Sequence, residues 1–171
     1  GEDEILKTRE SLDWKYAEFE LTDEIYNFWD AKETGASLNS DWDNLIKSYQ
    51  EKYPEKSKEL LRRIKGNTPE NFESDFDQFL KDCDKNNLSM ATRKASKVCL
   101  DFFVKKMPEL IGGSADLTPS NNTFSESSST FSNENPSGNH INYGVREFGM
   151  SAIMNGMVLH GGIKPYGATF L

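Results

Sequence analysis

One short apolar run that ends in glycines limits the possible folds more than any other feature of this sequence. Residues 109–116 (ELIGGSAD) have the composition of a strand that feeds a loop of small residues and an acid. An amphipathic helical pattern over residues 91–103, with Ser89 as its candidate cap, precedes this strand. A second helical pattern over residues 143–160 and a strand-like segment over residues 164–171 follow it. This order predicts an α/β fold whose sheet is incomplete in this chain, with ligands expected beside the Gly-rich loop.

The first part of the chain is predicted to be helical. Residues 3–66 show apolar stripes at helical spacing, with a break expected at residues 37–40. Pro54 is the expected start of one helix and Gly66 its stop. Four apolar residues at helical spacing indicate one more helix: Phe72, Phe76, Phe79 and Leu80. We interpret the aromatic residues here as core and interface packing, and find no catalytic constellation among them.

The composition argues against several classes of protein. The net charge is −8, whereas a nucleic-acid-binding protein needs a basic face for the phosphates. The longest apolar stretch, residues 150–163, is interrupted and too short to cross a bilayer, so a cytoplasmic protein without membrane association is expected. Cys83 and Cys99 are too few for a disulfide framework or a zinc site. The sequence stops at Leu171 inside an apolar run, so we expect a fragment of a longer protein.

Glu147 is the residue that physical reasoning selects first. The helix that it begins is apolar on nearly every side and is expected to be buried all round, where a carboxylate is rare without a partner. The helix N-terminus favours the charged carboxylate, whereas burial raises its pKa. From the residues alone, an ion pair with Arg146 or an interaction with the helix dipole is the more ordinary interpretation.

The serine-rich segment that precedes this helix, residues 124–139, is interpreted as a surface loop with solvated serines.

Several motifs together resemble one family. Four segments are similar in order and spacing to the thiamine-diphosphate-dependent transketolases: residues 92–96 (TRKAS), 112–121 (GGSADLTPSN), 143–150 (YGVREFGM) and 165–171 (PYGATFL). Two earlier sequences, LDWKY and WDAK, resemble the helical stretch between that family's first and second domains. The resemblance implies that residues 1–88 are the helical end of the first domain and the inter-domain linker. Residues 89–171 are then the first part of a doubly wound, mainly parallel pyrimidine-binding domain, incomplete in this chain.

The resemblance also implies roles for five residues. Glu147 matches the glutamate that hydrogen-bonds a ring nitrogen of the cofactor's aminopyrimidine and favours the tautomer that takes a proton from the thiazolium carbon. Arg93 and Ser120 match residues that bind the sugar phosphate, a role suited to a planar guanidinium. Asp116 matches an acid near the cofactor at the subunit interface, and Phe170 an aromatic residue that packs on the pyrimidine. By residue type alone, these last four would pass for a helix charge, a turn serine, a capping aspartate and a core residue.

The implied activity is transfer of a two-carbon ketol unit from a ketose phosphate to an aldose phosphate by a homodimer of the pentose phosphate pathway. The implied cofactors are thiamine diphosphate and a divalent metal, Mg²⁺ or Ca²⁺, held by the missing first domain. Dihydroxyacetone synthase, which uses formaldehyde as acceptor, shares every quoted motif, and a non-catalytic dimer-forming module is the alternative of another class. His140 and His160 match no catalytic histidine of the family and are interpreted as structural. We expect the chain by itself to be inactive.

Overall fold

The computed structural model describes residues 1–86 and 89–170. Contacts divide the chain into two compact units, Gly1–Lys52 and Tyr53–Leu171. The domain boundary predicted after residue 88 falls on residues outside the described ones, and it stays a prediction. Among the described residues, no helix has the length and apolar character that crossing a membrane would require.

Three helices form the first unit: α1 (Glu2–Ser11), α2 (Asp23–Trp29) and α3 (Lys32–Lys52). Residues 1–52 are all described, and none of the three helices contains a buried residue. Large side chains such as Trp29 are exposed, so the core packing predicted for them is wrong within this unit, which has no second layer to cover them. The interface packing predicted for the same residues stays a prediction. The break predicted at residues 37–40 is also wrong. The helix continues there, and Asn39 donates a hydrogen bond of 3.1 Å to Asp43 one turn later.

The second unit begins with three helices: α4 (Pro54–Ile64), α5 (Phe72–Lys85) and α6 (Thr92–Lys106). Pro54 starts α4, as predicted, because its fixed φ suits a first turn in which its missing N–H is not needed. Gly66 ends the helical conformation after α4, as predicted. It has a left-handed φ of 72°, and its N–H donates to the carbonyl oxygen of Arg63. The cap predicted at Ser89 is wrong, because the extended residue Ala91 caps α6, which begins at Thr92.

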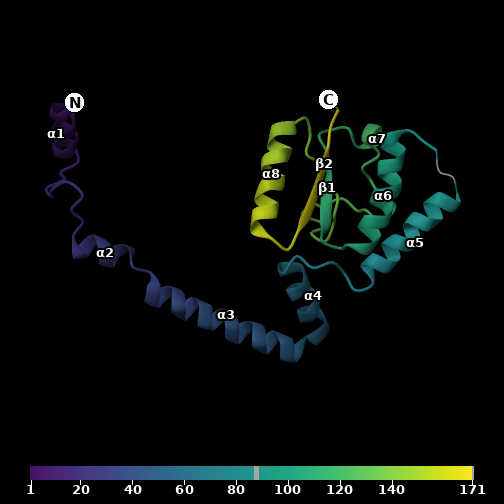
Figure 1. Cartoon of the computed structure of the whole chain (residues 1–171), viewed down its shortest axis with the longest axis horizontal. Helices are drawn as coiled ribbons and strands as arrows, with labels where there is room; N and C mark the ends of the chain where they lie inside the picture. Colours follow the sequence, from purple (N-terminus) through teal and green to yellow (C-terminus); the bar gives the residue numbers. More distant parts are fainter. Residues whose placement is uncertain (87–88, 171) are drawn as a thin grey trace. The chain divides into compact units, whose positions relative to one another are not determined.

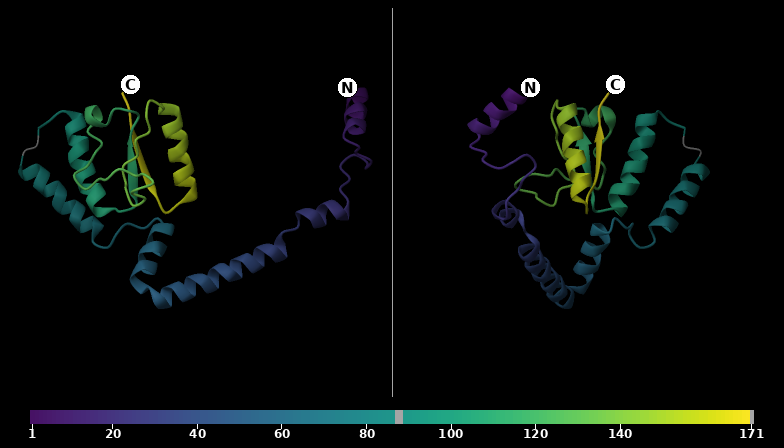
Figure 2. Two further views of the ribbon diagram at one scale, coloured as in Figure 1. Left: turned by 180° about the vertical axis from the view of Figure 1, so that it is seen from behind. Right: turned by 60° about the vertical axis from the view of Figure 1, so that its left-hand side comes forward.

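Two parallel strands form the sheet of the second unit: β1 (Leu110–Ser114) and β2 (Lys164–Ala168). Two helices lie between them in the sequence: α7 (Thr118–Asn121) and α8 (Glu147–His160). Parallel neighbours need such a crossover connection. Figure 2 shows α6 and α8 on opposite sides of the strands, where α6 contacts β1 and α8 contacts β2. The predicted α/β order is confirmed, while Leu171, expected to end the second strand segment, lies outside the described residues.

The core of the second unit lies between α8 and the strands. It consists of three buried residues and two half-buried ones: Ala115, Tyr143, Met150, Ile141 and Met154. Met150 is the one buried residue of α8. Among the described residues nothing covers Phe148, which is 90% exposed, or Leu159, which is 87% exposed. The prediction that this helix is buried all round is therefore wrong for these residues. One face packs on β2, and no described element covers the opposite face.

The long segment between α7 and α8 is irregular, as predicted, but its serines are not all solvated. Ser125 is fully buried, and its hydroxyl accepts a hydrogen bond from the N–H of Ser127 at 3.2 Å. The segment then returns to the sheet. The N–H of Ile141 donates to the carbonyl oxygen of Gly112 at 2.8 Å, and the N–H of Gly112 donates to Asn139 at 3.1 Å. These bonds cover the edge of β1 that β2 leaves open.

Candidate functional site

The carboxyl end of the two strands gathers all five predicted site residues. Asp116 follows β1 and Phe170 follows β2. Helices α6 and α8 run antiparallel to the strands, because each is joined by only three residues to the strand after it. Their first residues therefore lie at the carboxyl end, and among them are Arg93 and Glu147. Ser120 lies in α7 at the same end (Figure 1). Open α/β sheets bind ligands at this edge.

Gly112 and Gly113 allow the backbone to close tightly around β1. A β-carbon at Gly112 would collide with the carbonyl oxygen of Tyr166 on β2, and one at Gly113 with the carbonyl oxygen of Ile141. Both positions require glycine because a neighbouring backbone approaches from each side. The two glycines of the GGSAD motif thus have a packing role, and the polar residues after them carry the chemistry.

A polar hollow of about 220 Å³ lies beside the end of β1. Six residues line it: Ser114, Asp116, Thr118, Pro119, Asn142 and Gly144. Asp116 has a left-handed φ of 59°, and its N–H donates to the carbonyl oxygen of Ser114 at 2.9 Å, which turns the chain sharply. The Asp116 carboxylate is exposed and accessible to a ligand. Sequence analysis found Asp116 and missed Ser114 and Asn142, although Ser114 belongs to the small-residue run that marked the loop.

Buried hydroxyls fix the backbone next to this hollow. The hydroxyls of Ser114 and Thr123 lie 2.6 Å apart, and the Tyr166 hydroxyl donates to the carbonyl oxygen of Thr123 at 3.1 Å. Burial raises the pKa of Tyr166 to about 12, so the phenol stays protonated. His140 is also buried, with Nε2 3.3 Å from the Thr118 hydroxyl, and burial lowers its pKa. The neutral imidazole therefore packs and hydrogen-bonds here, which supports the structural role expected for it.

Glu147 is the first residue of α8, and its side chain is exposed. The apolar surroundings predicted for it are wrong for the described residues, because they leave this side of α8 open. Arg146 precedes the helix and donates from Nη1 to the carbonyl oxygen of Tyr143 at 2.9 Å, so its guanidinium binds the backbone instead of the Glu147 carboxylate. The Glu147 carboxylate is therefore open to a hydrogen bond from a ligand at the start of α8.

The start of α6 is suited to an anion. Arg93 is the second residue of this helix and is exposed, and the first turn contains no acidic residue. The helix N-terminus attracts negative charge, and a guanidinium adds donors that match phosphate oxygens. Ser120, half-buried in α7, adds a hydroxyl at the same edge of the sheet. Phe170 is 56% exposed and offers an aromatic surface after β2.

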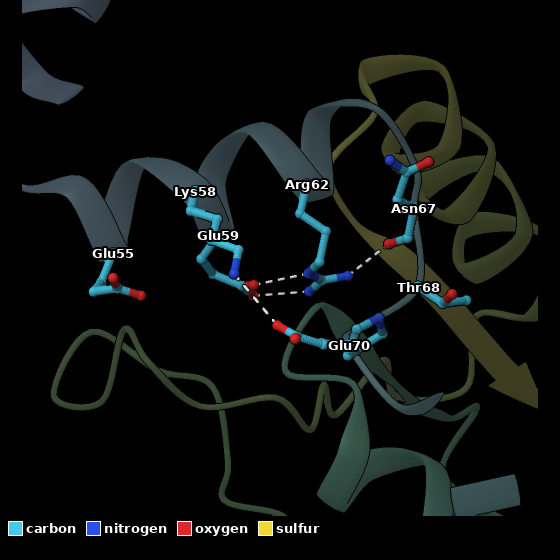
Figure 3. Close-up of a pocket in the computed structure, with 8 residues that line it drawn as sticks. Glu55, Lys58, Glu59, Arg62, Asn67, Thr68 and Glu70 are labelled. Carbon is cyan, nitrogen blue, oxygen red and sulfur yellow. Dashed lines mark hydrogen bonds and ion pairs between the residues drawn. The ribbon is translucent and has the colours of Figure 1, made fainter. Parts of the chain in front are cut away.

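A second polar hollow, of about 400 Å³, lies along α4 and the segment after it (Figure 3). Arg62 is its central residue. The Arg62 guanidinium donates to both carboxylate oxygens of Glu59, at 2.7 and 2.8 Å, and to the carbonyl oxygen of Asn67 at 2.6 Å. Two further bonds of 2.9 Å reach Glu109, whose side chain is only 1% exposed. Arg62 thus ties α4 to the residue before β1, a contact that sequence analysis did not predict.

The Arg62 network shifts the pKa values of its carboxylates. Burial by itself would raise the pKa of Glu109, but the hydrogen bonds and charge of Arg62 hold it below its ordinary value. Hydrogen bonds from Arg62 lower the pKa of Glu59 to about 2. The two carboxylates raise the pKa of the guanidinium in return. Carboxylates held so strongly in the charged form are poor general bases, and we interpret this network as a structural connection.

The described residues fit one of the two implied cofactors. They contain no group of three or more His, Cys, Asp or Glu side chains that could hold a metal ion, so they do not fit the divalent metal. They do fit a polar aromatic ring. An exposed carboxylate at Glu147, an exposed aromatic surface at Phe170 and the polar hollow at Asp116 share one edge of the sheet.

Comparison with known proteins matches most of the chain. Residues 1–69 match the family model of the transketolase thiamine diphosphate binding domain, and residues 89–171 match that of the transketolase pyrimidine binding domain. The whole chain is 47% identical to transketolase 1 of Vibrio cholerae and 47% identical to transketolase 1 of Escherichia coli. It spans 26% of the length of each of these relatives.

Solved structures give the same result. A transketolase from Pichia stipitis in complex with sedoheptulose 7-phosphate is 38% identical, with a TM-score of 0.67 over 81% of this chain and 21% of that one. The transketolase from Leishmania mexicana is 31% identical, with a TM-score of 0.72 over 88% of this chain and 22% of that one. The arrangement of helices around the parallel strands is thus shared with complete enzymes of known structure.

Proposed function

Because this chain belongs to the transketolase family, we propose that it supplies the pyrimidine side of a site that transfers a two-carbon ketol unit from a ketose phosphate to an aldose phosphate. The observation that carries the proposal is the gathering of the five predicted residues at the carboxyl end of β1 and β2. The solved relative with bound sedoheptulose 7-phosphate supports sugar phosphates as the substrate class.

Glu147 is the proposed catalytic residue. Thiamine diphosphate, when bound, supplies the carbon nucleophile that takes up the ketol unit. The Glu147 carboxyl holds a proton at the ring nitrogen of the aminopyrimidine, and its place at the exposed start of α8 lets a ring approach it without distorting the helix. Phe170 packs against that ring, and Asp116 binds beside it. A ring placed there would also exclude water from Glu147 and so strengthen the hydrogen bond between the carboxyl and the ring.

Arg93 and Ser120 are the proposed phosphate-binding residues. The Arg93 guanidinium adds a full positive charge to the helix N-terminus, and the Ser120 hydroxyl adds a neutral donor. Together they orient a sugar phosphate by its phosphate group. A substrate without a phosphate would gain nothing from either residue, which makes their contribution separable by the choice of substrate.

The remaining parts of the proposal concern the whole enzyme. A divalent metal, Mg²⁺ or Ca²⁺, is held by residues outside this chain, since the described residues do not fit it. The enzyme acts as a cytoplasmic homodimer in the pentose phosphate pathway, and the exposed apolar residues of α8, such as Phe148 and Leu159, provide surface for further packing. The names of the matched relatives favour transketolase over dihydroxyacetone synthase. Formaldehyde tested as the acceptor separates the two.

Replacement of Glu147 by alanine in the full-length enzyme tests the proposal. Loss of general acid–base help lowers turnover by about 10²–10⁴-fold, and the fold is kept because the exposed carboxylate packs against little. Steady-state ketol transfer is measured together with circular dichroism. Glu126→Ala is the matched control, since it removes another exposed carboxylate, from the irregular segment. Turnover of Glu147→Ala within a few-fold of the Glu126→Ala value would contradict the catalytic role.

A further inference from the structure

Helix α8 begins without the usual cap. Its N-cap residue is Arg146, and among the described residues no side chain makes a capping hydrogen bond at this helix start. Serine, threonine, aspartate and asparagine are preferred at this position, because their oxygens accept a hydrogen bond from a first-turn N–H, which a guanidinium cannot do. The first backbone bond of the helix runs from the N–H of Met150 to the carbonyl oxygen of Arg146, at 2.7 Å. This bond therefore depends on how the backbone of Arg146 is held.

The Arg146 side chain supplies a tether in place of a cap. Its Nη1 atom turns back and donates a hydrogen bond to the carbonyl oxygen of Tyr143 at 2.9 Å. Tyr143 is a fixed point of the structure, since it is only 5% exposed and packs with Ala115 and Met150 in the core. The tether thus joins the core to the residue immediately before Glu147.

The turn between the two tethered residues leaves space for the guanidinium. The N–H of Arg146 donates to the carbonyl oxygen of Gly144 at 2.8 Å, which closes a tight turn with Val145 at its centre. Gly144 has a left-handed φ of 69°, and a β-carbon on it would collide with Nη1 of Arg146. Gly144 also lines the polar hollow beside Asp116, so the tethered turn borders the proposed site.

We propose that Arg146 is a positioning residue for Glu147, an inference that rests on the function proposed above. The guanidinium fixes the turn, and the turn fixes the first residue of α8. The described residues leave the Glu147 side chain exposed, so its carboxylate takes its direction from the backbone that carries it. Reaction geometry is sensitive at this scale, since a displacement of about 1 Å can lower a rate by about 10²-fold. A guanidinium bound to the backbone also does not compete with the cofactor ring for the Glu147 carboxylate.

Hydrogen exchange of the full-length enzyme, followed by mass spectrometry of its peptides, tests the tether directly. Arg146→Ala should speed exchange in peptides that contain the N–H of Met150, because the backbone that accepts its hydrogen bond is no longer held. Arg146→Lys keeps a donor of similar reach and should restore most of the protection. Val145→Ala is the matched control, since it changes the same turn at a side chain that is 74% exposed. Equal exchange in Arg146→Ala and Val145→Ala would overturn the proposal.

Steady-state kinetics test whether the tether acts through Glu147. Arg146→Ala should lower kcat by about 10–100-fold and leave the KM for a ketose phosphate almost unchanged, because Arg146 is proposed to act on Glu147 and not on the substrate. In the Glu147→Ala background the same replacement should have no further effect on kcat, because the group that it positions is gone. Losses that multiply in the double variant, or a rise in KM in place of the loss in kcat, would show an independent role and overturn the proposal.

Gly144→Ala displaces the guanidinium without removing it. This replacement should lower kcat in the wild type and much less in the Arg146→Ala background, where no guanidinium remains to be displaced. Equal effects in the two backgrounds would contradict the tether.

The two proposals fail in different ways. Unchanged turnover of Glu147→Ala would contradict the proposed function and with it the positioning role, even if exchange shows the tether. Lowered turnover of Glu147→Ala, together with normal exchange and normal turnover of Arg146→Ala, would overturn the positioning role alone.

Discussion

Replacing Arg62 by alanine is expected to destabilise the second unit by about 3–5 kcal/mol at neutral pH. The replacement removes both 2.9 Å hydrogen bonds to Glu109, whose side chain is 1% exposed and so cannot regain water without unfolding. Removal of one partner of a buried ion pair typically has this cost because the remaining charge is left uncompensated. The two bonds to Glu59 add less than those to Glu109, since the Glu59 carboxylate is 41% exposed and water replaces part of the lost interaction.

Two controls distinguish this cost from a general effect of truncation on α4. Lys58→Ala changes another residue of α4 and breaks its exposed ion pair with Glu70, which lies in the segment after the helix. It should cost less than about 1 kcal/mol. The double variant Arg62→Met, Glu109→Met replaces the buried pair by apolar side chains and should recover most of the loss. Stability is measured by urea unfolding followed by circular dichroism. Tryptophan fluorescence is unsuitable, because all three tryptophans lie in residues 1–52.

The same network gives the expected pH dependence. Arg62 holds the pKa of Glu109 below its ordinary value and lowers that of Glu59 from 4.5 to about 2. A lowered pKa in the folded state adds stability above the unfolded value of 4.5, and this stability is lost as the pH falls toward 2. The difference between wild type and Arg62→Ala should therefore shrink over this range. A cost below 1 kcal/mol at neutral pH, or one that does not change between pH 7 and 3, would refute the reasoning.

The remaining predictions concern the sheet and the proposed site. Gly112→Ala should destabilise the second unit by about 1–3 kcal/mol, because its β-carbon would meet the Tyr166 carbonyl oxygen. Gly35→Ala is the control, since nothing lies near the β-carbon there, and equal urea midpoints for the two variants would contradict the prediction. Arg93→Ala in the full-length enzyme should raise the KM for a ketose phosphate by about 10–150-fold, which corresponds to a lost contact worth about 1.5–3 kcal/mol. The KM for hydroxypyruvate, which has no phosphate, should stay almost unchanged. An equal rise in KM for both substrates would show that Arg93 is structural. Calorimetric titration of the chain with thiamine diphosphate and Mg²⁺ should give no saturable heat at micromolar cofactor, since the described residues provide no metal site; a saturable signal would show a more self-contained site.

The sequence by itself determined the local structure where the signals act within a few residues. Pro54 and Gly66 bounded α4 because a fixed φ and a left-handed φ act on the turn that contains them. Apolar spacing located α5, and the glycines of the GGSAD run marked β1. Local signals failed where they were weak, as at residues 37–40, three of which are small and polar and all of which α3 includes without interruption.

The tertiary structure decided which distant residues meet. Arg62 and Glu109 are 47 positions apart, and nothing in either segment indicates the other, because their pairing depends on how α4 lies against β1. The exposure of Glu147 likewise depends on which surfaces cover α8, whereas its sequence indicates only that the helix is apolar. Phe79 and Phe102 likewise stack only because α5 packs against α6, and the periodicity of neither helix indicates its partner. Periodicity describes one element at a time, while a shared site requires the relative placement of several.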